Sequence, residues 1–332
     1  MEKGQISLQF NWIFILAVGI IILIFFLIVV KNQTKNADYE LSGDILRNLD
    51  TVVKSSEHVE GTFKRIKIPD SVIVFECETE TNISFYNIGN GIRKDIPYDI
   101  IFSQRELKGT ELMSITKSWD VPFRIAMFQY LTTKKAQFLI VEDTGGLAQE
   151  LFDLLPENIS KKMIETNDIV EDNNYDYYKI IQFEESLLPS ENIRAPADRV
   201  HTITISPALG LDSYGTVKFD ETTTHSYLKL ASLFGAIFAH DADIYECTMN
   251  KAFQRFETLI NLTSSRMAEL KTTETDGQCI SLLTWGEEDL DNILSNIQNN
   301  GLSSADTIYI SSNSLERGNH NLIRGKNCPL VY

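Results

Sequence analysis

The chain has 332 residues, a formal net charge of −16 and a sequence pI near 4.8. Hydrophobic residues make up 43% of it, with 18 Phe and 12 Tyr, a composition typical of a folded rather than a disordered protein. Nucleic-acid binding depends on clustered Lys and Arg that neutralise phosphates. An acidic chain without a basic stripe therefore argues against a nucleic-acid partner.

The first predicted element is the uncharged segment from Leu8 to Val30. From Ile13 to Val30 every residue is apolar or Gly, and as a helix this run is about 27 Å long, close to the thickness of a bilayer's hydrocarbon core. A helix satisfies its own backbone hydrogen bonds, which lipid cannot do, so spanning is favoured over a surface location. We predict one transmembrane helix in contact with membrane lipid; the alternative is a buried core helix.

The residues that flank this segment indicate whether it is retained. After Val30 the chain reads KNQTKNADYE, which lacks the small-residue cleavage site of a secretory signal peptide. Ahead of it stands MEKGQISLQFNWI, in which Lys3, Gly4, Gln5 and Ser7 fit a known pattern. This segment resembles the class III signal peptides of archaeal type IV pilin-like proteins. The resemblance implies cleavage between Gly4 and Gln5, a retained apolar helix, and other envelope or pilus-like subunits as partners.

Gln9 departs from the pilin-like pattern, which has Glu at this position to neutralise the new terminal amine. A neutral amide is a weaker partner for a buried ammonium, and the alternative is a plain signal anchor with a chance KGQ. The flanking charges nearly cancel, because Lys31 and Lys35 are offset by Asp38 and Glu40. The pilin-like junction, the short tail and the scattered cysteines favour an extracytoplasmic C-terminal domain; the inverted topology remains the alternative.

The cysteines, which are Cys77, Cys247, Cys279 and Cys328, are far apart and form no C-x-x-C pair. This spacing gives no support to a zinc site or a redox motif. Disulfides are expected if the domain is outside the cell, with three pairings that the sequence does not rank. Free buried thiols are the alternative.

The chain order predicts a cytoplasmic tail or processed leader over 1–7, the membrane helix over 8–30, and a stalk with an amphipathic helix over 31–57. A β-rich region follows over 58–133, with strand-like segments at 63–68, 71–78, 82–88 and 98–102. The segment 123–131 is either a strand or a short helix. These β-branched and aromatic runs indicate a small antiparallel sheet.

From 134 to 332 the pattern changes to apolar strands separated by helices, which is typical of a three-layer α/β region. The expected strands are 136–143, 168–171, 177–183, 200–206 and, at an edge, 215–219. The expected helices are 145–156, 226–240 and 243–271. Late strands at 278–283 and 306–311 are expected on either side of a helix at 287–298. The predicted fold class is therefore mixed α+β, with an α/β region after the β-rich one.

Asp143, Thr144 and Gly145 spell the D-T-G of aspartic proteases at the end of an apolar strand. Catalysis by that motif needs a second carboxylate, and the chain has no second D-T-G or D-S-G. Gly145 and Gly146 are a weak candidate for phosphate binding at a helix N-terminus. The simpler interpretation is a strand-to-helix turn in which Asp143 or Thr144 caps the helix.

His240, Asp241 and Asp243 lie close together in the sequence and are a weak candidate for a metal site. An N-cap between two helices explains them more simply. The sequence indicates no cofactor and no nucleophile–base pair. We expect a single-pass membrane-anchored surface protein with a non-catalytic domain, pilin-like or envelope-binding. The alternative is a membrane-tethered enzyme with a pocket at the strand ends near Asp143.

Overall fold

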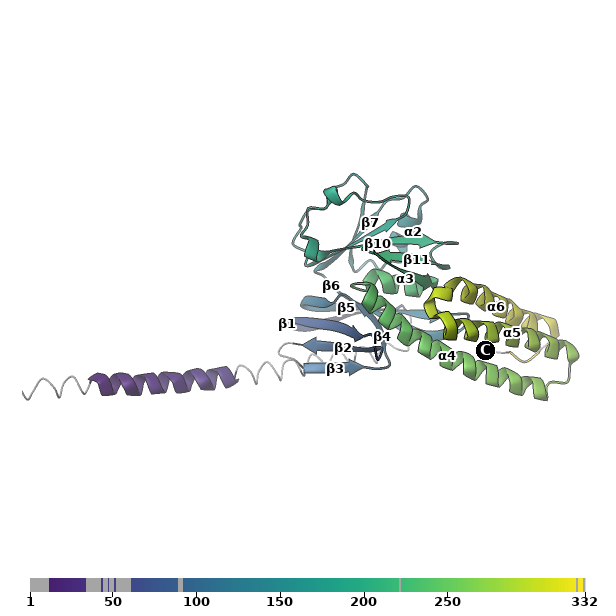
Figure 1. Cartoon of the computed structure of the whole chain (residues 1–332), viewed down its shortest axis with the longest axis horizontal. Coiled ribbons are helices and arrows are strands. Elements are labelled where there is room, and N and C mark those ends of the chain that lie inside the picture. Colours follow the sequence, from purple (N-terminus) through teal and green to yellow (C-terminus); the bar gives the residue numbers. More distant parts are fainter. Residues whose placement is uncertain are drawn as a thin grey trace, which may run out of the picture.

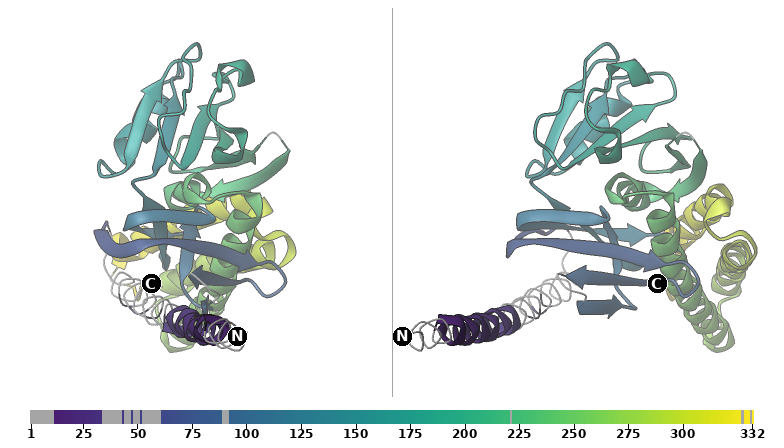
Figure 2. Two further views of the ribbon diagram at one scale, coloured as in Figure 1. Left: turned by 90° about the vertical axis from the view of Figure 1, so that its left-hand side faces the viewer. Right: turned by 60° about the vertical axis from the view of Figure 1, so that its left-hand side comes forward.

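The computed structural model describes residues 12–33, 43, 47, 51, 61–88, 92–220, 222–326, 328–330 and 332. The first described element is a helix, Trp12–Gln33, which is long and apolar enough to cross a membrane, and none of its most apolar window is buried by the rest of the chain (Figure 2). It begins inside the predicted segment and ends three residues beyond it. Gly4, Gln5 and most of the predicted stalk and amphipathic helix lie outside the described residues.

The first sheet, sheet A, is built from residues 63–133 and has the order β3-β2-β1-β5-β6-β4 (Figure 1). Its strands are β1 (Phe63–Glu78), β2 (Ile83–Ile88), β3 (Ile92–Ile96), β4 (Ile100–Ser103), β5 (Glu106–Asp120) and β6 (Arg124–Thr133). All neighbours are antiparallel except β4 and β6. The segment 123–131, which periodicity leaves open, is therefore a strand, and it pairs along both of its edges.

The second sheet, sheet B, has the order β12-β11-β10-β9-β7-β8. Its strands are β7 (Ala136–Val141), β8 (Ser160–Ile164), β9 (Tyr177–Phe183), β10 (Val200–Pro207), β11 (Tyr214–Phe219) and β12 (Thr223–Leu228). The first four are parallel, and β11 and β12 add antiparallel pairs. Two expectations were wrong: the strand after β7 is 160–164 and not 168–171, which forms only an isolated bridge, and β11 is internal because β12 pairs outside it.

The helices of the folded part are α2 (Leu147–Leu154), α3 (Lys229–Phe238), α4 (Ala242–Thr273), α5 (Gly277–Asn300) and α6 (Ala305–Lys326), with short 3-10 turns η1 (Ser190–Asn192), η2 (Ala197–Arg199) and η3 (Gly301–Ser304). The late strands expected at 278–283 and 306–311 were wrong, since both segments are helical. The carboxylate of Asp276 caps α5 by accepting from the N–H of Gln278 at 2.7 Å. Cys279, Leu283, Leu290, Ile293 and Ile297 then recur on its buried side at helical spacing.

The main core is continuous through both sheets and the helices between them. Trp119 of β5 lies at its centre, stacked on Phe128 at 5.1 Å between ring centroids, and its indole N–H donates to the carbonyl of Leu228 at 2.9 Å. Helix α3 lies between the two sheets (Figure 1), and every residue from Leu230 to Phe238 is buried. A smaller cluster covers the other face of sheet B, under segments 165–176 and 184–199. The predicted mixed α+β class is confirmed.

Candidate functional site

The N-terminal helix exposes a continuous apolar surface. Large side chains such as Ile13, Phe25 and Leu27 are 66%, 61% and 61% exposed. Because exposure of apolar area to water costs about 25 cal/mol per Å², this surface requires a nonpolar environment that the described part of the chain does not provide. The helix is therefore compatible with membrane anchoring.

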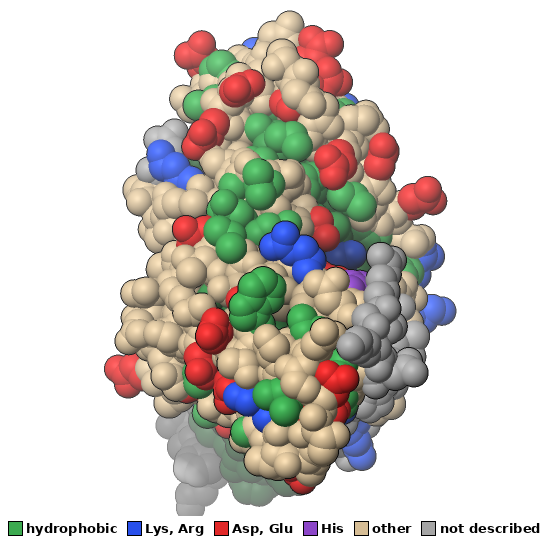
Figure 3. Space-filling model, turned by 90° about the vertical axis from the view of Figure 1, so that its right-hand side faces the viewer, with side chains coloured by type: hydrophobic (Ala, Val, Ile, Leu, Met, Phe, Trp, Pro, Cys, Tyr) green, Lys and Arg blue, Asp and Glu red, His purple; other side chains and the backbone are tan. Residues whose placement is uncertain are grey.

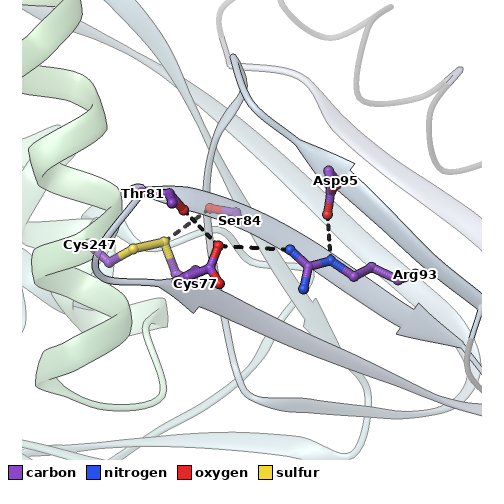
Figure 4. Close-up of polar contacts among 7 residues, drawn as sticks. Cys77, Thr81, Ser84, Arg93, Asp95 and Cys247 are labelled. Atoms are coloured by element: carbon purple, nitrogen blue, oxygen red, sulfur yellow. Dashed lines mark hydrogen bonds and ion pairs between the residues drawn. A yellow bond between two sulfur atoms is a disulfide. The ribbon is translucent and has the colours of Figure 1, made fainter.

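Two disulfides link the folded part. Cys77 of β1 is bonded to Cys247 of α4, with the Cα atoms 6.1 Å apart, and Cys279 of α5 is bonded to Cys328 near the C-terminus, with the Cα atoms 5.5 Å apart. The four cysteines of the chain are all paired. Figure 4 shows the first bond crossing from the sheet to the helix, beside the hydroxyl of Ser84. Paired cysteines of this kind are typical of oxidising compartments outside the cytoplasm.

A small polar network surrounds the Cys77–Cys247 bond at the end of the hairpin β2–β3 (Figure 4). The hydroxyl of Thr81 donates to a carboxylate oxygen of Glu78 at 2.8 Å. Arg93 lies 4.0 Å from Glu78 and 2.6 Å from Asp95. These side chains are half exposed, so the ion pairs contribute little to the free energy of unfolding. The bond itself is a covalent link between this corner of sheet A and α4.

The turn at Asp143 is a helix-capping structure. The carboxylate of Asp143 accepts from the backbone N–H groups of Gly145, Leu147 and Ala148 at 3.0, 3.2 and 2.8 Å. A Cβ at Gly145 would lie 2.9 Å from this carboxylate, so the turn requires a residue without a side chain. Three backbone donors already occupy the carboxylate. Its role at this turn is to satisfy the first N–H groups of α2.

His240, Asp241 and Asp243 lie at the junction of α3 and α4. Asp241 is the N-cap of α4: one carboxylate oxygen accepts from the N–H of Ile244 at 3.0 Å, and the other accepts from Arg105 at 2.6 Å. Both oxygens are thus engaged. Among the described residues, no group of three His, Cys, Asp or Glu side chains is placed to hold a metal ion.

Sequence reasoning missed a polar cluster at this junction, in which one tyrosine and one lysine are buried and two histidines are half-buried. It consists of Tyr177 and Lys179 from β9, His201 from β10, and His240 from the α3–α4 turn. The rings of His201 and His240 are 4.1 Å apart between centroids, and Tyr177 is stacked on His201 at 5.0 Å. The ammonium of Lys179 is fully buried and donates to the carbonyl of Ala239 at 2.9 Å. Two strands and one turn that are distant in the sequence, β9, β10 and the α3–α4 turn, meet here. No local pattern could therefore have indicated the cluster.

Burial determines the protonation of this cluster. The pKa of His201 is lowered to about 4 and that of His240 to about 3, mainly by loss of solvation. The charge of Lys179 contributes to both shifts, and repulsion from His201 contributes to that of His240. Burial also lowers the pKa of Lys179 to about 8, against the opposing attraction of Asp220 and Asp241. Nε2 of His201 and Nδ1 of His240 are buried without a hydrogen-bond partner among the described residues. At neutral pH the two imidazoles are therefore neutral, and the cluster is held by ring packing.

Comparison with protein-family models, with curated proteins and with solved structures finds no match to this chain.

Proposed function

We propose that this chain is a single-pass membrane-anchored surface protein whose disulfide-linked domain lies outside the cytoplasm and acts by binding rather than by catalysis. One observation carries the proposal. An exposed apolar helix of membrane-spanning length precedes a domain in which all four cysteines are paired. The helix needs lipid, and the disulfides need an oxidising compartment.

A non-catalytic role is supported by how the candidate acidic residues are used. The carboxylates of Asp143 and Asp241 both accept backbone N–H groups at the start of a helix. A carboxylate in that position stabilises the helix N-terminus and is not free to act as a general base. The rival proposal of a tethered enzyme at the Asp143 turn therefore receives no support from the geometry of that turn.

Pilin-like processing is the finer part of the proposal. The Lys3-Gly4-Gln5 junction supports cleavage after Gly4, and the lack of a small-residue cleavage site after Val30 supports retention of the apolar segment. Gln9, an amide in place of the family's carboxylate, favours a stand-alone anchored module over a packed filament subunit.

Anchoring is tested by fractionation of cells that express the full chain. We expect the protein to stay with membranes after an alkaline carbonate wash. The double variant I22R/F25R should be released, because an Arg at the centre of a span costs about 2.5–3.5 kcal/mol. The matched variant I22L/F25L should stay in the membrane. Release of the unmodified chain into the aqueous fraction would refute the proposal.

Topology and processing are tested on the same membranes. Protease added outside intact cells should digest the domain, and a non-reducing gel should show no free thiol until a reductant is added. N-terminal sequencing should find Gln5 as the first residue, whereas a G4L variant should begin at Met1. A domain that is protected from external protease, with reduced cysteines, would place it in the cytoplasm.

A further inference from the structure

A cavity of about 750 Å³ opens where β1, β5 and the β6–β7 turn meet. Four lysines line it: Lys67, Lys108, Lys134 and Lys135. Glu111 is the one acidic side chain among the described lining residues. In a chain with a net charge of −16, this is a local concentration of positive charge. On the face drawn in Figure 3, by contrast, Lys and Arg are scattered among Asp and Glu.

The lysines are only partly neutralised. Lys134 pairs with Glu111, and Lys108 pairs with Glu106 at 2.7 Å. Lys67 and Lys135 are exposed and have no ion pair with a described residue. The pKa of Glu111 is held below its usual value by the hydrogen bond from Lys134, and the nearby charges of Arg65 and Lys67 add to the effect.

The backbone keeps this cavity open. The β1–β5 pairing shifts register between Lys67 and Ser71, which interrupts the regular ladder at this point. Gly109 lies opposite this irregularity with φ +123°, a conformation that favours glycine, so the position is suited to a residue without a side chain to fill the space. The cavity therefore follows from the local strand geometry. The lysines surround a space that stays empty because Gly109 has no side chain.

The lining defines the class of ligand. Among the described lining residues Ile68 is the one apolar side chain and none is aromatic, so these residues offer little surface on which a base or an acyl chain could pack. Lysine ammonium groups act as flexible point charges, so they suit anionic groups such as carboxylates, sulfates and phosphates without a fixed fork geometry. The volume lies within the range of pockets that hold small ligands, about 300–1,000 Å³.

We propose that this cavity binds an acidic oligosaccharide, through carboxylate or sulfate groups that contact Lys67 and Lys135. The inference deepens the envelope-binding function proposed above and rests on it for the source of the ligand. Binding is measured on purified protein, whereas anchoring is measured on membranes, so failure of one is distinguishable from failure of the other.

The probe is a heparin-derived hexasaccharide titrated by calorimetry into the full chain in neutral detergent. Neutral maltohexaose serves as the control ligand. The test variant is K67Q/K135Q. The matched control is K94Q/K162Q, which removes the same charge from exposed lysines on β3 and β8 that do not line the cavity. Thermal midpoints of both variants establish that the fold is retained.

We expect the unmodified chain to bind the acidic hexasaccharide and not maltohexaose, and K67Q/K135Q to bind it about tenfold more weakly. K94Q/K162Q should bind with nearly unchanged affinity. No binding by the unmodified chain, or a similar loss in both variants, would overturn the proposal, because the second result means a general charge effect. A third result would also overturn it: the unmodified chain binds anionic phosphatidylglycerol vesicles, K67Q/K135Q does not, and the saccharide does not displace the vesicles. The ligand would then be a lipid surface.

Discussion

The histidine cluster at the α3–α4 junction predicts a loss of stability in mild acid. In the folded chain burial lowers the pKa values of His201 and His240 to about 4 and about 3, against about 6.5 in the unfolded chain. As the pH falls below 6.5, the two histidines therefore become protonated in the unfolded state but stay neutral in the folded state. Stability is fully present above pH 6.5 and falls as the pH decreases toward 4. Between pH 7 and pH 5 each histidine removes about 2 kcal/mol from the free energy of unfolding.

Other charges around the pair modify this effect without reversing it. Lys179 and Arg105 lower the pKa of both imidazoles, and Asp241 raises it. Asp220 also raises that of His201. Loss of solvation is the largest contribution for each histidine. Most carboxylates remain ionised down to pH 5, so the interval from pH 7 to pH 5 mainly reports the histidines.

The assay is urea unfolding of the full chain at pH 7 and pH 5, followed by tryptophan fluorescence. Trp119 is a suitable probe because it is fully buried against Phe128. The unmodified chain should lose about 4 kcal/mol between the two pH values. H201Q/H240Q should lose far less, because neither side chain titrates. H320Q, which removes an exposed histidine of α6, should behave as the unmodified chain does. An unchanged pH dependence in H201Q/H240Q would refute the reasoning.

The remaining predictions concern the disulfides and the α2 cap. Loop-closure entropy predicts that C77A/C247A, with a sequence separation of 170, loses about 5 kcal/mol of unfolding free energy. C279A/C328A, with a separation of 49, should lose about 4 kcal/mol. Urea unfolding under non-reducing conditions should show the larger loss for C77A/C247A. The reverse order would exclude loop closure as the main cause. D143A should lose about 1 kcal/mol because three N–H groups of the turn and α2 lose their acceptor, and a chain of unchanged stability would mean that water replaces the carboxylate.

Sequence patterns predicted the fold best where the local signal was long. The helix expected over 243–271 is α4, Ala242–Thr273, because a stripe of large apolar residues extends along most of its length, from Ile244 to Met267. The sequence patterns failed at 278–283 and 306–311, where short runs of β-branched and apolar residues resemble strands. Those runs are parts of α5 and α6, and the packing of α5 against α4 and of α6 against α5 outweighs the local strand preference.

The candidate sites divide in the same way. The Asp143 turn was accessible to sequence reasoning because the carboxylate, the glycines and the helix it caps lie within six residues. The histidine cluster was not, since His201 and His240 are isolated in the sequence and meet only when β10 and the α3–α4 turn pack together. The lysine cavity was also missed. Lys67 and Lys135 are brought together by strand pairing between β1, β5 and β6, which no spacing along the chain encodes.

Helix α4 is fixed to sheet A over its first three turns by three different interactions. At its N-terminus the Asp241 cap pairs with Arg105. The disulfide at Cys247 follows, and one turn later the ammonium of Lys251 donates to Ser84, Ile96 and Asp99 at 2.9, 3.0 and 3.1 Å. Because a buried ammonium has three protons, these bonds satisfy it completely. The second half of α4 leaves the sheet and packs with α5, which packs in turn with α6 (Figure 1). The direction of the helical arm formed by α4, α5 and α6 is therefore set at the base of α4, where one contact is covalent. Reduction of Cys77–Cys247 should loosen the attachment of this arm to sheet A. The bond between Cys279 and Cys328 acts within the arm itself.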